Sequence, residues 1–87
     1  MSKQDFIQSL KDYVEKTVIE FLDHYGLAGK FPAIQQKADK VLMDFGVNAH
    51  FDAYTNGVVD VVVSETGKSK DEVMDAFSKY YYSGKFE

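Results

Sequence analysis

YTNGVVDVVVSETG, at residues 54–67, decides the fold of this chain because it supports two different local structures. Asn56-Gly57 ahead of a run of valines is typical of a tight turn between two β-strands. Gly67 and Ser69 are instead typical of one helix that ends and another that begins. The chain is all-α or α+β depending on which of these signals holds.

The two structures sort the side chains of this stretch differently. In a hairpin with a two-residue turn, Asp60 would lie on one face and Asp52 on the other, so neither face would be apolar throughout. In a helix, large apolar side chains share one side and small or polar ones share the other: Phe51, Tyr54, Val58, Val61 and Val62 against Ala49, Ala53, Gly57, Asp60 and Ser64. Valine and an interior glycine are weak helix formers, but burying a valine-sized side chain contributes about 1.5–3 kcal/mol, more than the propensity costs. We therefore predict a helix over residues 49–66, with a hairpin at residues 47–64 as the alternative.

Capping signals and apolar residues spaced three or four apart predict three more helices. The first covers residues 3–25 and ends at a glycine, the second covers residues 32–45 from Pro32, and the last covers residues 70–82 after the capping residue Ser69. Their apolar faces hold Phe6, Ile7, Leu10, Val14, Val18, Phe21 and Tyr25 in the first helix, Ile34, Ala38, Val41, Leu42 and Phe45 in the second, and Val73, Met74, Phe77, Tyr80 and Tyr81 in the last. We predict an all-α, compact four-helix domain that occupies the whole of residues 1–87.

The composition is that of a folded, single-domain protein. The 87 residues suffice for one core, and a hydrophobic content of 45% is too high for a disordered chain. There is no cysteine, which is compatible with a reducing compartment, and no uninterrupted apolar run exceeds three residues. We expect neither a signal peptide nor a membrane span, and a cytoplasmic location.

The charged residues argue against a nucleic-acid partner. All ten basic residues are lysine and the net charge is −4, whereas arginine supplies the bidentate contacts to phosphates and guanine. Residues 62–77, VVSETGKSKDEVMDAF, resemble the paired helices of helix-turn-helix proteins and the N-terminal segment of bacterial histone-like DNA-bending proteins. The resemblance implies DNA binding, but the helix that would read the DNA begins with Asp71 and Glu72, whose charges repel phosphates. We therefore rank a helix-turn-helix DNA-binding protein below the other functions.

The sequence contains no motif for catalysis, for a metal or for a cofactor. His24 and His50 are the only histidines, and neither is predicted to be a metal ligand or a general base. The sequence shows no arrangement of serine, histidine and acid typical of nucleophilic catalysis, and no glycine-rich loop typical of phosphate binding. We predict a protein that is not an enzyme and uses no cofactor.

Two sets of residues are candidates for contact with a partner. Four apolar residues fall outside the predicted core stripes and form the first set: Ile19, Met43, Tyr82 and Phe86. The segment between Lys40 and Lys68 has no lysine, and its acidic residues Asp44, Asp52 and Asp60 form the second set, suited to a basic partner. Both sets are candidates for a surface that binds another protein, and the ordinary interpretation of the acidic set is a solvated face.

Our leading prediction is a small protein-binding module that occludes a partner protein, such as an inhibitor, immunity protein or regulator of the kind that phages and mobile elements encode. The alternative is a self-associating structural or accessory subunit. The small residues Ala49, Ala53 and Gly57 would let a second helix approach closely, either from the same chain or from a second copy in a homodimer.

Overall fold

The computed structural model describes residues 3–85, and this part of the chain is helical almost throughout. Its elements are α1 (Lys3–His24), the 3-10 turn η1 (Ala28–Lys30), α2 (Phe31–Phe45), α3 (Val47–Thr66) and α4 (Lys70–Ser83). No strand occurs within these residues, so the predicted all-α, four-helix fold is confirmed and the alternative hairpin at residues 47–64 is wrong. The predicted helix boundaries differ from the observed ones by two residues at most.

The decisive stretch forms the middle and end of α3, which runs through Asn56-Gly57 without interruption. The helix buries a row of residues on one side: His50, Tyr54, Val58, Val59 and Val62. Burial of this face outweighs the low helix propensity of valine and glycine. The helix ends at Gly67, whose positive φ of 76° places it in the left-handed region where glycine carries no penalty.

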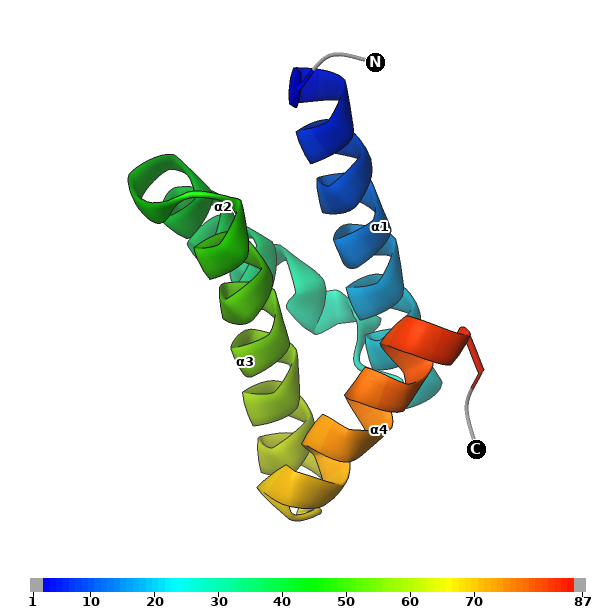
Figure 1. Ribbon diagram of the computed structural model, residues 1–87. Coiled ribbons are helices and arrows are strands. Elements are labelled where there is room, and N and C mark those ends of the chain that lie inside the picture. The colour runs from blue at the N-terminus through cyan, green and yellow to red at the C-terminus, as the bar shows by residue number, and fades with distance from the viewer. Residues whose placement is uncertain (1–2, 86–87) are drawn as a thin grey trace.

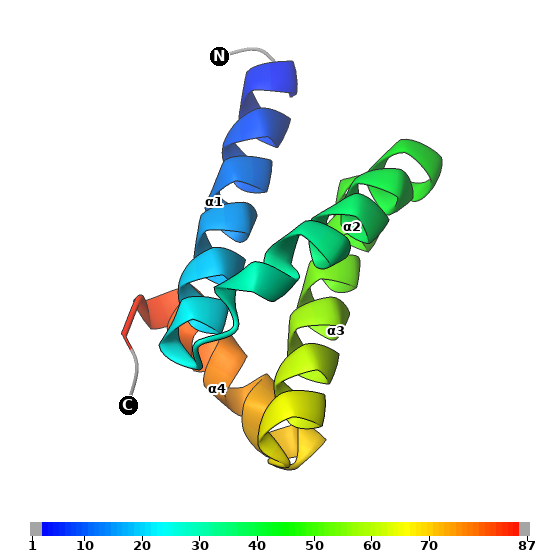
Figure 2. The same ribbon diagram turned by 180° about the vertical axis from the view of Figure 1, so that it is seen from behind.

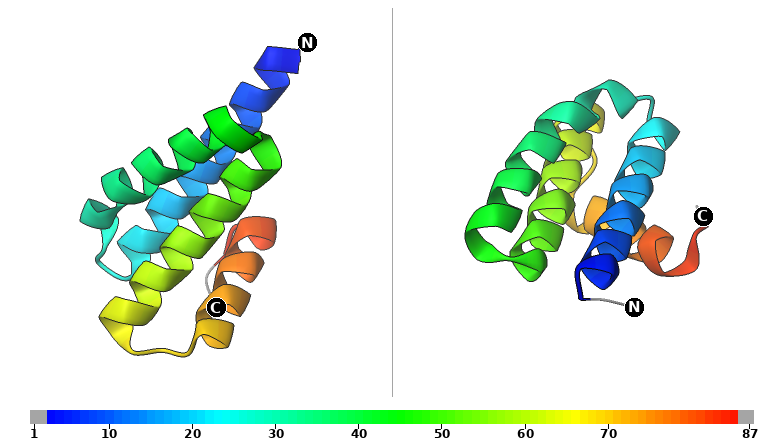
Figure 3. Two further views of the ribbon diagram at one scale, coloured as in Figure 1. Left: turned by 90° about the vertical axis from the view of Figure 1, so that its left-hand side faces the viewer. Right: turned by 90° about the horizontal axis from the view of Figure 1, so that it is seen from above.

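The helices pack around one core. α2 and α3 lie side by side and antiparallel, joined by Gly46 alone, while α1 runs in the same direction as α3 (Figure 1). Seen from behind, α2 crosses in front, from the end of α1 to the start of α3 (Figure 2). α4 lies across the lower part of α1 and α3, as the side and top views also show (Figure 3).

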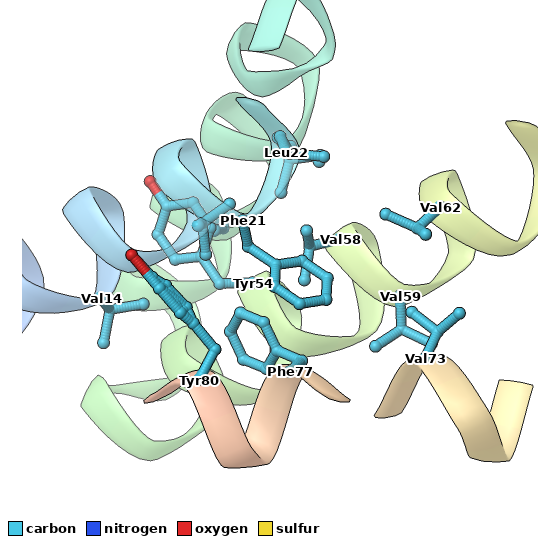
Figure 4. Packing of buried hydrophobic residues seen from close by; sticks show 13 residues of the cluster. Val14, Phe21, Leu22, Tyr54, Val58, Val59, Val62, Val73, Phe77 and Tyr80 are labelled. Atoms are coloured by element: carbon cyan, nitrogen blue, oxygen red, sulfur yellow. The ribbon is translucent and has the colours of Figure 1, made fainter. Parts of the chain in front are cut away.

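All four helices contribute to the buried core. Its members are Val14, Val18, Phe21 and Leu22 of α1, Ile34 and Ala38 of α2, Tyr54, Val58, Val59 and Val62 of α3, and Val73, Phe77 and Tyr80 of α4. Phe21 meets Phe77 edge to face at a centroid distance of 5.2 Å (Figure 4). This geometry is favourable for aromatic rings and links the first helix to the last.

Gly57 brings α2 and α3 into close contact. A Cβ atom at this position would lie 2.9 Å from Cγ2 of Ile34, which is buried in α2. The close approach that the small residues of α3 allow is thus made within the chain at this point. Asp60 and Ser64, farther along the same face, are exposed.

Two residues that we predicted for the core, Phe6 and Phe45, are largely exposed, at 57% and 76%. Phe6 lies in the first turns of α1, which extend past the rest of the molecule (Figure 1). Phe45 is the last residue of α2, at the corner where the chain turns into α3. In both helices the row of apolar residues extends past the part of the helix that the other helices cover.

Within residues 3–85, none of the helices combines the length and the apolar character that crossing a bilayer requires.

Candidate functional site

A groove lies between the N-terminal parts of α1 and α3 and the end of α4, and we call it the α1–α3 groove. It has a volume of about 300 Å³ and is lined by Leu10, Lys11 and Val14 of α1, by Val47, Asn48, His50 and Phe51 of α3, and by Tyr81 and Tyr82 of α4. Most of these side chains are apolar or aromatic. The core begins at Val14 on α1, so the groove lies at the N-terminal edge of the core, between α1, α3 and the end of α4.

His50 is the most deeply buried polar residue of the groove, with 1% of its surface exposed. Its Nδ1 lies 2.7 Å from the carbonyl oxygen of Ala38 on α2. A carbonyl can only accept, so Nδ1 carries the proton and donates it, and in the neutral ring Nε2 is then a bare acceptor. Nε2 is buried and has no hydrogen-bond partner among the described residues.

A polar network lies beside the groove and connects three helices. The carboxylate oxygen Oε2 of Glu15 accepts hydrogen bonds from the Tyr54 hydroxyl at 2.7 Å, from Nε2 of Gln35 at 3.1 Å and from Nζ of Lys11 at 3.4 Å. Lys11 also pairs with Asp39 at 3.6 Å. We call these five residues the Glu15 network. It fixes α1 against α2 and α3 at the N-terminal edge of the core.

The ionisation of this network follows from its contacts. Burial alone would raise the pKa of the Glu15 carboxyl, but the hydrogen bonds from Tyr54 and Gln35 and the charge of Lys11 together lower that pKa below its ordinary value. Burial, followed by the hydrogen bond to Glu15, raises the pKa of the Tyr54 phenol. Glu15 is therefore an anion and Tyr54 a phenol donor at neutral pH, and their hydrogen bond is charge-assisted.

The third wall of the groove is the aromatic end of α4. The ring of Tyr81 makes edge contacts with Tyr13 at 5.1 Å, with Phe51 at 5.0 Å and with Tyr82 at 5.1 Å. The Tyr13 hydroxyl also donates to the carbonyl oxygen of Tyr81 at 2.7 Å. These contacts hold the end of α4 against α1 and α3 and set the shape of the groove.

The structure separates the apolar residues that we predicted to bind a partner. Tyr82 lines the groove and is 82% exposed. Ile19 and Met43 are exposed, at 40% and 88%, but neither lines the groove. Phe86 lies outside the described residues.

The predicted acidic surface does not belong to the groove. Asp44, Asp52 and Asp60 are all exposed, and none of them forms an ion pair within residues 3–85 or lines the groove. No group of three or more potential metal-ligating side chains occurs in the described part of the chain.

Sequence reasoning missed both His50 and Glu15 as residues of interest. For His50 a signal was available: with Tyr54 and Val58 it forms a row at intervals of four on the most buried helix, which predicts an inward-facing ring. Glu15 gave no comparable signal, because it lies among the other charged residues of the polar face of α1. Its partners come from α2 and α3, far away in the sequence.

Comparison of the chain with protein-family models, with curated proteins and with solved structures finds no match.

Proposed function

We propose that this protein is a small cytoplasmic protein-binding module, an inhibitor, immunity or regulatory protein without enzymatic activity, that occludes a partner through the α1–α3 groove. The observation that carries the proposal is the groove itself, an apolar hollow with the exposed side chain of Tyr82 at its edge. Concave apolar surfaces that hold a few polar groups are typical binding sites.

The exposed apolar residues near the groove support a protein partner. Phe6 lies one helical turn before Leu10 on α1, so exposed apolar surface continues from the groove toward the first turns of α1. Phe45 and Val47 flank Gly46 at the corner opposite. Aromatic side chains such as Phe6 and Phe45 are enriched at the centres of protein interfaces.

The rigidity of the groove also favours recognition. The Glu15 network fixes the lower part of α1, and the rings around Tyr81 fix the end of α4. A surface that is already ordered loses less conformational entropy when it binds, which leaves more of the contact energy for affinity.

Affinity capture from the host that encodes the protein tests the proposal. The tagged protein would be compared with its Tyr82→Ala variant, which removes a side chain from the groove, and with Met43→Ala, which removes one of similar exposure that lies away from it. We expect one stoichiometric partner to be retained by the wild type and by Met43→Ala, and retention by Tyr82→Ala to fall about tenfold.

Equal capture by all three forms, with unchanged far-ultraviolet circular dichroism, would remove the groove as the binding surface. Loss of capture with Met43→Ala alone would place the partner on α2 instead.

Self-association is the second candidate, favoured by the exposure of Phe6 and Phe45 at the open end of the molecule. A second copy could cover these rings, whereas the close approach at Gly57 is already made by Ile34 of the same chain. Light scattering at high micromolar concentration distinguishes the two functions, because a strict monomer excludes a homodimer.

A further inference from the structure

We infer that the α1–α3 groove receives an amphipathic helix of the partner, whose apolar face fills the groove and whose lysine or arginine pairs with Asp52 on the rim. This inference rests on the proposed function and adds the chemistry of the partner segment. Three features carry it: two neighbouring apolar hollows, walls built from helices without a strand edge among residues 3–85, and a local excess of negative charge.

The α1–α3 groove continues into a smaller hollow between α3 and α4. This second hollow, of about 60 Å³, is lined by Phe51 and Thr55 of α3 and by Phe77, Ser78, Tyr81 and Tyr82 of α4. Three of these residues, Phe51, Tyr81 and Tyr82, also line the groove, so the two hollows share a wall. Together they form a large apolar recess next to a small one. Side chains on one face of a helix, spaced three, four or seven residues apart, suit recesses arranged in this way.

The secondary structure of the walls favours a helix over an extended segment. An extended peptide gains affinity by adding a strand to the edge of a sheet, where the edge supplies backbone hydrogen bonds. Residues 3–85 contain no strand, and side chains of three helices line the two hollows. A segment that enters these apolar hollows must therefore pair its own N–H and C=O groups, which a helix does internally.

Asp52 lies on the rim of the two hollows, although it lines neither of them. Asn48 of the groove precedes it by four residues on α3, and Thr55 of the smaller hollow follows it by three. These spacings place the three side chains on one side of the helix, with Asp52 between the other two. The Asp52 side chain is exposed and forms no ion pair within residues 3–85. Its carboxylate is therefore available to a cation of the occupant.

The charges around the groove favour a basic occupant. Among the described residues that line the groove, Lys11 is the only lysine and none is acidic. Nζ of Lys11 lies 3.4 Å from Glu15 and 3.6 Å from Asp39, so two carboxylates face one ammonium group. α3 adds Asp52 and has no lysine along its length. A lysine or arginine of the partner is attracted to this side of the groove, whereas an acidic segment, or a second copy of a chain with a net charge of −4, is repelled.

A selection from a peptide library tests the inference without the natural partner. Peptides of about 15 residues, near the shortest length at which an isolated helix forms, would be displayed with apolar, neutral, basic and acidic residues equally represented. They would be selected against the immobilised full chain and sequenced. The peptide that binds best would then be synthesised with a fluorescent label, and its dissociation constant would be measured by anisotropy for the wild type and for each variant.

We expect the selected peptides to share apolar residues at intervals of three, four and seven, and to carry lysine or arginine more often than acid. Tyr82→Ala should weaken the best peptide about tenfold, because Tyr82 lines both hollows. Asp52→Asn should weaken it about threefold at low salt, and high salt should remove this difference. The controls Met43→Ala and Asp60→Asn change exposed side chains that line neither hollow, and should have no effect.

A charge reversal tests the position of the cation. Asp52→Lys should weaken the best peptide about tenfold at low salt, because an attraction becomes a repulsion. Replacing the basic residues of the peptide by glutamate, one at a time, should identify one position at which binding to Asp52→Lys recovers and binding to the wild type weakens. Asp52 is exposed, so these substitutions are compatible with folding, which far-ultraviolet circular dichroism verifies.

The inference is overturned if no peptide binds in a manner that needs Tyr82, if the selected peptides carry acid as often as base, or if Asp52→Asn and Asp60→Asn have equal effects. A wild type that dimerises in light scattering, with a monomeric Tyr82→Ala variant, would assign the groove to a second copy instead. Capture of a host partner that needs Tyr82 but is not displaced by the basic peptide would leave the proposed function intact and refute the basic helix. Peptide binding in the groove with capture unaffected by Tyr82→Ala would refute the proposed function.

Discussion

Gly57→Ala tests how closely α2 and α3 pack. On an isolated helix the substitution would stabilise by about 1 kcal/mol, because alanine is the better helix former. In this structure the new Cβ would lie 2.9 Å from Cγ2 of Ile34, well inside the about 3.5–4.0 Å of an ordinary carbon contact. The methyl group of a β-branched residue in a helix cannot easily rotate away.

The two effects can be weighed against each other. Overpacking a core by one methyl group costs about 1–3 kcal/mol, so Gly57→Ala should lower the free energy of unfolding by about 1 kcal/mol once the propensity gain is subtracted. Removing the obstacle should reverse the sign. In an Ile34→Ala background, itself destabilised by about 2–5 kcal/mol, the Gly57→Ala change should raise stability by about 1 kcal/mol.

The assay is urea unfolding followed by far-ultraviolet circular dichroism, with the free energy taken from the midpoint and slope. Gly29→Ala is the matched control, because Gly29 lies in η1 without a positive φ and a Cβ there would meet no atom within 4 Å. This control should be neutral or stabilising by up to about 1 kcal/mol. If Gly57→Ala stabilises the wild-type background as much as this control does, Ile34 does not confine α3 and the packing argument is wrong.

Three further changes probe the Glu15 network and the start of α4. Tyr54→Phe should lower the free energy of unfolding by about 1–2 kcal/mol in urea melts at neutral pH, because Glu15 loses a charge-assisted hydrogen bond; an unchanged midpoint would contradict this. The pKa of the Glu15 carboxyl is lower in the folded protein than in the unfolded chain, so Glu15 stabilises the fold at pH values above its ordinary pKa. This stabilisation disappears as the pH falls through the folded-state pKa. In an acid titration, Tyr54→Phe should therefore lose less stability than the wild type. Ser69→Ala should lower the free energy of unfolding by about 1 kcal/mol, because the Ser69 hydroxyl accepts a hydrogen bond from the Glu72 amide at 3.2 Å. The control Ser78→Ala, on the exposed side of the same helix, should change the free energy of unfolding by less than about 0.5 kcal/mol.

The helices themselves could be predicted from the sequence because their signals are local. The capping serine of α4, the glycines that follow α2 and α3, and apolar residues at intervals of three and four all act within one or two turns. Sorting the faces of residues 54–67 was sufficient to decide between helix and hairpin, because a hairpin would have left no apolar face and a helix left a wide one. The inward positions of Tyr80 and Tyr81 and the outward position of Tyr82 followed from the same spacing.

The candidate site depended on contacts between residues far apart in the sequence. Which half of α1 is covered depends on where α2 and α4 cross it, so the exposure of Phe6 and the groove beside Leu10 could not be predicted from the periodicity of α1. The partner of His50 is a carbonyl of α2, and the partners of Glu15 come from α2 and α3. Helix spacing and crossing depend on how side chains of different helices fit together.

Gly57 shows in one residue what the local sequence determines and what the tertiary packing decides. The sequence by itself determined that the stretch around it is a helix, since the apolar face of its neighbours outweighs the cost of an interior glycine. Only the tertiary structure decided why a residue without a side chain suits this position, because the atom that would collide with a Cβ belongs to Ile34 of another helix. Local periodicity determines which face of a helix is apolar, and the packing of distant residues decides what that face meets.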